Sequence, residues 1–256
     1  MMILVHRRHV NEIPILEVVA EQFKSQPLPC VIYYHGWRSA KELVLTQARK
    51  LAQQKIRVIL PDAFNHGERL LQQISQIPSF TFWQSIQANL AEFSLIIHYL
   101  KQNQLLLADL IGVGGVSMGG ITTCALLTQH PEIKWAACVM GSPQPLLYRE
   151  RVLQRAAYFK RALPADFREL TSWLSHYDLA SRPQKLAGRP LLFWHGTADP
   201  RIDFEDAYQF YVKHHTQSYG RQMQFDIGRG QGHLVRPETM DRITTFMAAQ
   251  IYEAED

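Results

Sequence analysis

The chain contains 256 residues, of which 46% are hydrophobic and 20% are charged, and its formal net charge at pH 7 is +4. This length and apolar content are sufficient for one large α/β domain or two small domains, and they exclude an intrinsically disordered chain. The three cysteines are too few for a disulfide framework and lie in apolar stretches, which favours buried thiols in a reducing compartment.

Charge and hydropathy also restrict the partners. The 27 Lys and Arg residues only slightly exceed the 23 Asp and Glu residues, and no dense basic run with interleaved aromatic residues predicts nucleic-acid binding. No apolar run approaches the ~18 residues that a membrane helix needs. Basic residues at 6–9 interrupt the first apolar stretch, so no signal peptide is expected. We therefore expect a cytoplasmic protein with neither a nucleic-acid nor a membrane partner.

Taken in chain order, short β-branched apolar runs alternate with longer amphipathic segments, which is typical of βαβ units around a mostly parallel sheet. The runs at residues 31–34 and 191–194 are apolar at every position, as expected of central strands covered by helices on both faces. Three helices are predicted at residues 81–99, 118–130 and 238–252. The predicted strands are residues 13–19, 29–34, 56–60, 110–116, 135–140, 190–194 and 223–227.

The interval between residues 141 and 189 is longer than one crossover connection requires. Within it, the patterns at residues 144–163 and 165–176 predict two helices separated by Pro164. We predict one domain, residues 1–256, with a helical cap insertion at residues 143–189 over one edge of the sheet.

The strongest motif is Gly115-Val116-Ser117-Met118-Gly119, which lies between a predicted strand and a predicted helix. This G-x-S-x-G pattern is typical of a nucleophile elbow, a sharp turn that exposes the serine hydroxyl and leaves no room for flanking side chains. The helix that follows directs its first N–H groups toward developing negative charge. Ser117 is therefore the candidate nucleophile.

The same region has a second interpretation as a dinucleotide-binding turn. Residues 112–117 begin like G-x-G-x-x-G, but Ser117 stands where close helix packing requires Gly or Ala. No acidic residue follows on the next predicted strand at the necessary distance. These departures favour the elbow.

Two further polar residues follow predicted strands. Asp199 comes after an apolar strand, where a triad carboxylate can hold a histidine in the correct tautomer. Asp203 is a competing acid, but its position predicts the cap of a helix that begins at Phe204. His233 lies in a glycine-rich loop after the last predicted strand and is the candidate general base. The order Ser117, Asp199, His233 is the one that α/β-hydrolases use.

The segment His35-Gly36-Trp37 follows an early buried strand. In an α/β-hydrolase, the loop at this place donates one backbone N–H to the oxyanion, and the residue after the nucleophile donates another. Trp37 and Met118 are therefore the candidate oxyanion donors, and His35 is expected to be buried and to shape the loop. In the next loop, Asp62 and His66 are expected to fix the backbone.

These motifs belong to a wider set of segments, namely His35-Gly36-Trp37, Pro61-Asp62, His66-Gly67-Glu68-Arg69, Phe82-Trp83-Gln84, residues 115–120, Met140-Gly141-Ser142, residues 192–199 and Gly232-His233. Together they resemble the small bacterial esterases of the YjfP type, in the α/β-hydrolase superfamily near its dienelactone-hydrolase and prolyl-oligopeptidase-like members. The resemblance implies an α/β-hydrolase fold, activity on simple carboxylic esters and a triad of Ser117, Asp199 and His233. It also implies that Trp37 and Met118 are the oxyanion donors.

Three residues are candidate substrate contacts: Arg69, which could instead fix its loop, Trp83 and Phe159. Residues 148–161 contain five cations and a single acid, and they predict a helix with Phe159 on its apolar side. Either the cations form a solvated face, or the apolar side roofs the pocket over Ser117 and limits the acyl length.

We predict a serine carboxylesterase that hydrolyses simple, short-chain esters through an acyl-enzyme, so its partner is a small-molecule ester. The alternatives are a thioesterase or peptidase-like hydrolase on the same triad, and a noncatalytic binding module that retains the fold. Because no H-x-x-x-H or C-x-x-C spacing occurs, neither a metal nor another cofactor is expected.

Overall fold

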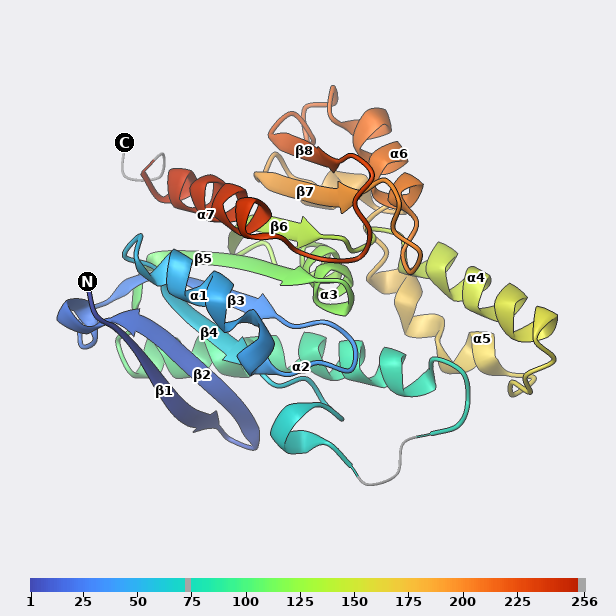
Figure 1. The fold of residues 1–256 in the computed structure, drawn as a ribbon, viewed down its shortest axis with the longest axis horizontal. Helices are drawn as coiled ribbons and strands as arrows, with labels where there is room; N and C mark the ends of the chain where they lie inside the picture. The colour runs from blue at the N-terminus through green and yellow to red at the C-terminus, as the bar shows by residue number, and fades with distance from the viewer. Residues whose placement is uncertain (72–74, 253–256) are drawn as a thin grey trace.

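An eight-stranded, mostly parallel sheet runs through the middle of the protein in the computed structural model, which describes residues 1–71 and 75–252 (Figure 1). The strand order is β1-β2-β4-β3-β5-β6-β7-β8. Strand β2 pairs antiparallel with β1 and β4, and the other neighbouring strands pair parallel. The strands are β1 (Ile3–Val10), β2 (Ile13–Ala20), β3 (Leu28–Tyr34), β4 (Arg57–Pro61), β5 (Leu106–Val116), β6 (Ile133–Val139), β7 (Leu191–Gly196) and β8 (Met223–Gly228).

All seven predicted strands are present, with small shifts at their ends, and the mostly parallel sheet is confirmed. Strand β1 was not predicted. It lies at the edge of the sheet and pairs with β2 from Ile3↔Ala20 to Val10↔Ile13. Only Val10 of this strand is buried. The sequence of β1 therefore lacks the alternation of apolar and polar residues by which a half-buried strand is predicted.

Two groups of helices cover the two faces of the sheet (Figure 1). Helices α1 (Leu45–Ala52) and α7 (Pro237–Tyr252) pack on one face. Helices α2 (Phe80–Gln102), α3 (Met118–Leu126) and α6 (Phe204–His214) pack on the other face. Helix α3 is shorter than the predicted helix at 118–130 because the chain turns after Leu126. Short 3-10 turns occupy Glu21–Phe23, Lys41–Val44, Gly67–Arg69, Ser172–His176 and Pro183–Leu186.

The segment between β6 and β7 lies beyond the carboxyl ends of β5 and β6 and contains α4 (Pro145–Tyr158) and α5 (Phe167–Leu170) (Figure 1). The predicted helix at 144–163 ends early, at Tyr158, and Lys160 then adopts a positive φ of 51° that no helix allows. The predicted helix at 165–176 is instead one α-helical turn followed by a 3-10 turn. The division into one domain with a cap at residues 143–189 stays a prediction.

Polar contacts join α4 to a later part of the same segment and to α6. The Leu146 N–H donates to Asp178 Oδ2 at 3.1 Å, and Arg151 forms an ion pair of 2.7 Å with Asp206 at the start of α6. The Arg151 contact is important because Asp206 is buried. Burial raises the pKa of Asp206 to about 6, even though Arg151 opposes this shift.

Of the described helices, none combines the length and the apolar character that a membrane span requires. Cys30, Cys124 and Cys138 are buried free thiols. A cytoplasmic location stays a prediction.

Candidate active site

Ser117 lies on the sharp turn between β5 and α3. Its φ of 56° and ψ of −113° fall in a region that residues other than glycine rarely adopt. The Ser117 N–H donates to the Val139 carbonyl at 2.9 Å, and the Ile121 N–H donates to the Ser117 carbonyl at 3.0 Å, so both sides of the turn are held. Gly112 and Gly114, which begin the alternative dinucleotide motif, lie inside β5 and not on this turn. The local geometry is that of a nucleophile elbow.

The elbow depends on close backbone contacts at two glycines. A Cβ atom on Gly119 would lie 2.3 Å from the Tyr34 carbonyl oxygen, and one on Gly115 would lie 2.6 Å from the Gly119 backbone. Any side chain at either position would therefore push α3 away from β3 and β5.

Three side chains from different loops meet at the carboxyl edge of the sheet. His233 Nε2 lies 2.8 Å from Ser117 Oγ, and His233 Nδ1 lies 2.6 Å from Asp199 Oδ2. In the neutral imidazole, Nδ1–H donates to the carboxylate and Nε2 accepts the serine hydroxyl proton. The three loops follow β5, β7 and β8, whose carboxyl ends lie on the same edge because the strands are parallel.

The loops after β7 and β8 are also tied to each other. The Thr197 N–H donates to the Gly228 carbonyl and the Ala198 N–H to the Gln231 carbonyl, each at 2.9 Å. Thr197 Oγ1 in turn accepts from the Gly230 N–H at 2.9 Å. These bonds hold the loop that carries the acid against the loop that carries the histidine.

The Asp199 carboxylate is buried and fully hydrogen-bonded. Its Oδ1 accepts the N–H groups of Arg201 at 2.8 Å and Ile202 at 3.1 Å. Burial raises the pKa of Asp199, but hydrogen bonds from His195, His233 and Arg201 outweigh it and hold the pKa well below its ordinary value. Asp199 is therefore ionised throughout the neutral range.

The competing acid has a different role. Asp203 Oδ1 accepts the Glu205 N–H at 3.1 Å at the start of α6, which confirms the predicted helix cap.

His195, near the end of β7, is a residue that sequence reasoning missed. Its Nε2 lies 3.2 Å from Asp199 Oδ2 and 3.0 Å from the Ile202 carbonyl oxygen, and its side chain is buried. A protonated Nε2 can donate to both oxygens, so Asp199 has two imidazole partners. The signal available in the sequence was the position of His195, four residues before the acid on an apolar strand.

Two backbone N–H groups are available near Ser117. Met118 is the first residue of α3, so its N–H has no acceptor within the helix. The Trp37 N–H has no acceptor among residues 1–71 and 75–252. Trp37 lines the same cavity as Ser117, and a Cβ atom on Gly36 would lie 3.5 Å from Ser117 Cβ. Such a pair of N–H groups can bind an oxyanion.

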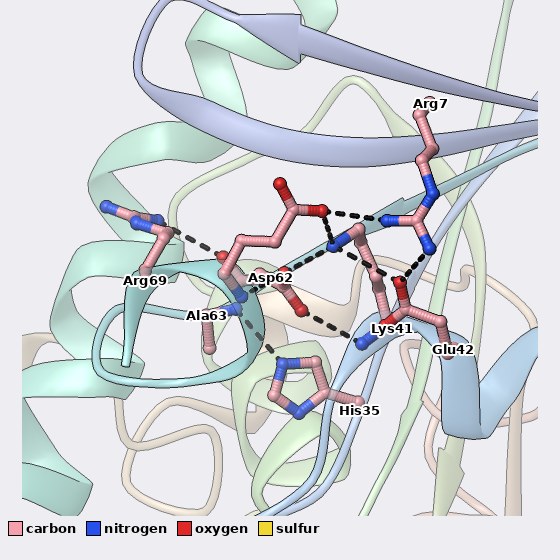
Figure 2. Close-up of polar contacts among 8 residues, drawn as sticks. Arg7, His35, Lys41, Glu42, Asp62, Ala63 and Arg69 are labelled. Carbon is pink, nitrogen blue, oxygen red and sulfur yellow. Dashed lines mark hydrogen bonds and ion pairs between the residues drawn. The ribbon is translucent and has the colours of Figure 1, made fainter. Parts of the chain in front are cut away.

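His35 lies at the start of the loop that carries Trp37, and Figure 2 shows its ring hydrogen-bonded to Ala63. The Ala63 N–H donates to His35 Nε2 at 3.0 Å, so Nδ1 carries the proton and donates to the Gly36 carbonyl at 2.8 Å. Burial lowers the pKa of His35 to about 4, so this neutral tautomer persists at neutral pH. The Gly36 carbonyl and the Trp37 N–H belong to one trans peptide and point in opposite directions, so the bond from His35 also fixes the N–H.

An ion cluster with Lys41 and Asp62 buried at its centre joins the loop after β3 to the loop after β4 (Figure 2). Lys41 Nζ lies 2.5 Å from Asp62 Oδ2 and 2.6 Å from Glu68 Oε1. Asp62 also accepts the N–H groups of Lys41 and Glu68, each at 3.0 Å. Burial raises the pKa of Asp62, but these hydrogen bonds together lower it below its ordinary value. Asp62 therefore fixes the loop as predicted.

His66 and Arg69 extend the same connection. His66 Nε2 accepts the Arg38 N–H at 3.0 Å, so His66 is also a loop-fixing residue. Arg69 forms two hydrogen bonds to the Glu92 carboxylate, at 2.6 and 2.8 Å, and donates to the Asp62 carbonyl at 3.1 Å. Of its two predicted roles, Arg69 fills the structural one.

The prediction that Trp83 contacts the substrate is corrected. Its side chain is buried and packs edge-on against Phe82 and Tyr148, with ring centroids 5.0 and 5.8 Å away. Phe82 and Tyr148 line the cavity that contains Ser117, whereas Trp83 lies behind them. Trp83 therefore belongs to the hydrophobic core, as expected of a large aromatic residue on the buried side of a helix.

Ser117 lines a cavity of about 550 Å³, and a second cavity of about 570 Å³ adjoins it. The two cavities share five lining residues, Pro78, Ser79, Tyr148, Arg161 and Arg201. Phe159 is exposed and lines only the second cavity. It therefore lies outside the immediate surroundings of Ser117.

Within the described parts of the chain, no group of three or more His, Cys, Asp or Glu side chains could hold a metal ion.

A mostly parallel sheet with a hydrogen-bonded serine, histidine and aspartate at the carboxyl ends of its parallel strands defines the class of the protein as a serine hydrolase of the α/β-hydrolase fold. Residues 84–252 match the prolyl oligopeptidase family, and the chain belongs to this family.

The relatives extend over most of the chain. YitV from Bacillus subtilis (strain 168) is 33% identical over 229 residues, which cover 88% of this chain and 90% of YitV. Esterase YjfP from Escherichia coli (strain K12) is 29% identical over 245 residues, 96% of this chain and 98% of YjfP. The crystal structure of TT1662 from Thermus thermophilus has the same fold, with a TM-score of 0.76 and 17% identity over 98% of this chain and 99% of that one.

Proposed function

We propose that this serine hydrolase is a carboxylesterase in which Ser117 is the nucleophile, His233 the general base and acid, and Asp199 the residue that orients His233. The observation that carries the proposal is the unbroken chain of hydrogen bonds from Ser117 Oγ through the imidazole to a buried, ionised carboxylate. The similarity to Esterase YjfP over nearly the whole of both chains supports an ester as the substrate.

In the first step, His233 Nε2 removes the hydroxyl proton of Ser117 as Oγ forms a bond to the ester carbonyl carbon. The π electrons of the carbonyl move to its oxygen, and the resulting oxyanion accepts the N–H groups of Trp37 and Met118. Asp199 stabilises the imidazolium that forms. Because backbone N–H groups of a folded loop and of a helix start are fixed before the reaction, their alignment costs little free energy at the moment when charge develops.

The tetrahedral intermediate then collapses. The carbonyl re-forms, the bond to the alkoxide oxygen breaks, and His233 Nε2–H gives its proton to the leaving alcohol. Water attacks the acyl-enzyme by the same sequence, with His233 as base, and the carboxylic acid leaves while Ser117 regains its proton. We propose a simple, short-chain ester as the substrate.

The test is labelling with a fluorophosphonate probe, combined with hydrolysis of 4-nitrophenyl acetate. The wild-type chain should be labelled at Ser117, as mass spectrometry of peptides would locate, and should hydrolyse the ester. Ser117→Ala should remain folded, escape labelling and lose at least about 10³-fold in turnover. Near-native turnover by Ser117→Ala would exclude this mechanism. A strong preference for the matched thioester over the oxyester would assign the activity to a thioesterase instead.

A further inference from the structure

Arginine side chains surround the two cavities next to Ser117. Arg38, Arg161 and Arg201 line the cavity that contains Ser117. Arg161 and Arg201 also line the adjoining cavity, together with Arg151 and Arg155. No Asp or Glu is among the described residues that line either cavity.

Most of these cations have no acidic partner among residues 1–71 and 75–252. Arg151 pairs with Asp206 and is accounted for by the anchoring of α4. The other four arginines form no salt bridge with any Asp or Glu in the described parts of the chain, at separations up to 4.0 Å.

The unpaired arginines come from three separate parts of the chain. Arg38 follows β3, Arg161 follows α4, and Arg201 lies two residues after Asp199. A solvated helix face would account for Arg155 alone, but it does not account for cations that converge on one opening from three loops. Like charges gathered in this way repel one another, and a cavity lined by one sign of charge raises the local concentration of ions of the opposite sign.

Arginine is suited to a particular kind of ligand. Its planar guanidinium donates paired N–H groups to the oxygens of carboxylates and phosphates. Tyr148 and Phe82, whose rings are in contact, supply aromatic walls of the cavity that contains Ser117. An ester that places its scissile carbonyl at Ser117 and an anionic group toward Arg161 and Arg201 would use both features.

Resting on the proposed esterase function, we propose that the substrate is an anionic ester, which carries a carboxylate or phosphate outside the scissile bond, and that Arg161 and Arg201 bind this group. The exposed position of both arginines keeps the anion partly hydrated, so we expect a contribution of about tenfold or somewhat more to kcat/KM. Salt should reduce this contribution because it screens partly exposed charges.

The experiment compares matched esters that differ in charge. On the acyl side, 4-nitrophenyl hemiglutarate is compared with the 4-nitrophenyl ester of monomethyl glutarate. On the alcohol side, the acetate ester of 3-hydroxypropyl phosphate is compared with propyl acetate. In at least one pair, wild type should prefer the anionic ester by about tenfold or more in kcat/KM, and the responding pair identifies the side that carries the anion.

The variants then assign the preference to its residues. The double variant Arg161→Gln, Arg201→Gln should reduce the anionic-to-neutral ratio of kcat/KM to near one, because it removes both cations. The backbone N–H of Arg201 that donates to Asp199 is kept. Arg49→Gln, which removes an exposed cation on α1, is the matched control and should keep the wild-type ratio.

Two outcomes would overturn the proposal: a ratio of one or less in both pairs for wild type, or a preference that survives in the double variant. Either result can occur while the neutral esters are still hydrolysed by Ser117, in which case the esterase function stands and only the anionic substrate is excluded. Failure of the esterase function itself would appear as no hydrolysis of any ester and no fluorophosphonate labelling.

Discussion

Lys41 and Asp62 form a buried ion pair in which Nζ lies 2.5 Å from Oδ2, and this pair connects the loop that carries Trp37 to the loop after β4. Neither side chain is accessible to water. Lys41 also pairs with Glu68, but Lys41 is the only cation paired with Asp62 among the described residues, so the Asp62 carboxylate depends on it for a compensating charge. The pair lies beside the candidate oxyanion loop and not on the cavity wall, so its contribution is to loop geometry.

We expect Lys41→Met to lower the free energy of unfolding by about 3–5 kcal/mol, because it leaves the Asp62 carboxylate buried without its cation. Urea denaturation at pH 7 measures this loss. Lys50→Met is the control, since Lys50 pairs with a mostly exposed Asp241 and should cost less than about 1 kcal/mol. Equal effects of the two substitutions would mean that the buried pair adds no stability.

His35 should make stability depend on pH in a defined interval. Its pKa is about 4 in the folded protein and 6.5 ordinarily, so below pH 6.5 the unfolded chain binds a proton that the folded chain does not. The stabilisation is fully present above pH 6.5 and is lost as the pH falls toward 4, by up to about 3 kcal/mol. The free energy of unfolding of His35→Gln should therefore fall less than that of wild type between pH 7 and pH 4.5. Parallel loss in both proteins would contradict the assignment.

The two candidate acids should differ in their effect on turnover. Asp199→Asn should reduce kcat by orders of magnitude, up to about 10⁴, because the amide cannot hold His233 in the required tautomer or stabilise its imidazolium. Asp203→Asn should mainly cost stability, about 1 kcal/mol or less, because asparagine also caps helices. Steady-state kinetics with 4-nitrophenyl acetate decides between them, and the opposite ranking would move the acid to Asp203.

His195 should act through Asp199 as a positioning residue. We expect His195→Leu to lower kcat about tenfold, because it removes one hydrogen bond from the Asp199 carboxylate. KM should stay nearly unchanged. It should also shift the acid limb of the pH profile of kcat/KM. His195→Gln retains an N–H donor and should restore most of the turnover. If leucine and glutamine were equivalent in kcat and pH profile, His195 would be a packing residue only.

Signals that depend on neighbouring residues alone are readable in this sequence. The seven predicted strands, the G-x-S-x-G turn at Ser117 and the Asp203 cap all depend on local periodicity or on the conformation of a few adjacent residues. The order Ser117, Asp199, His233 carries long-range information only because parallel strands end on a common edge, so residues after different strands meet there.

The tertiary structure decided everything that depends on which side chains meet across long separations. It buried Trp83 behind Tyr148 and paired Arg69 with Glu92, although neither residue's immediate neighbours distinguish a core or structural role from substrate contact. Likewise, the cations at 155 and 161 have the sequence pattern of a solvated helix face, and only the packing of α4 beside Ser117 brings them to the cavities with Arg201. A local pattern specifies which face of a segment is apolar, whereas the partner of each polar side chain depends on how the elements pack together.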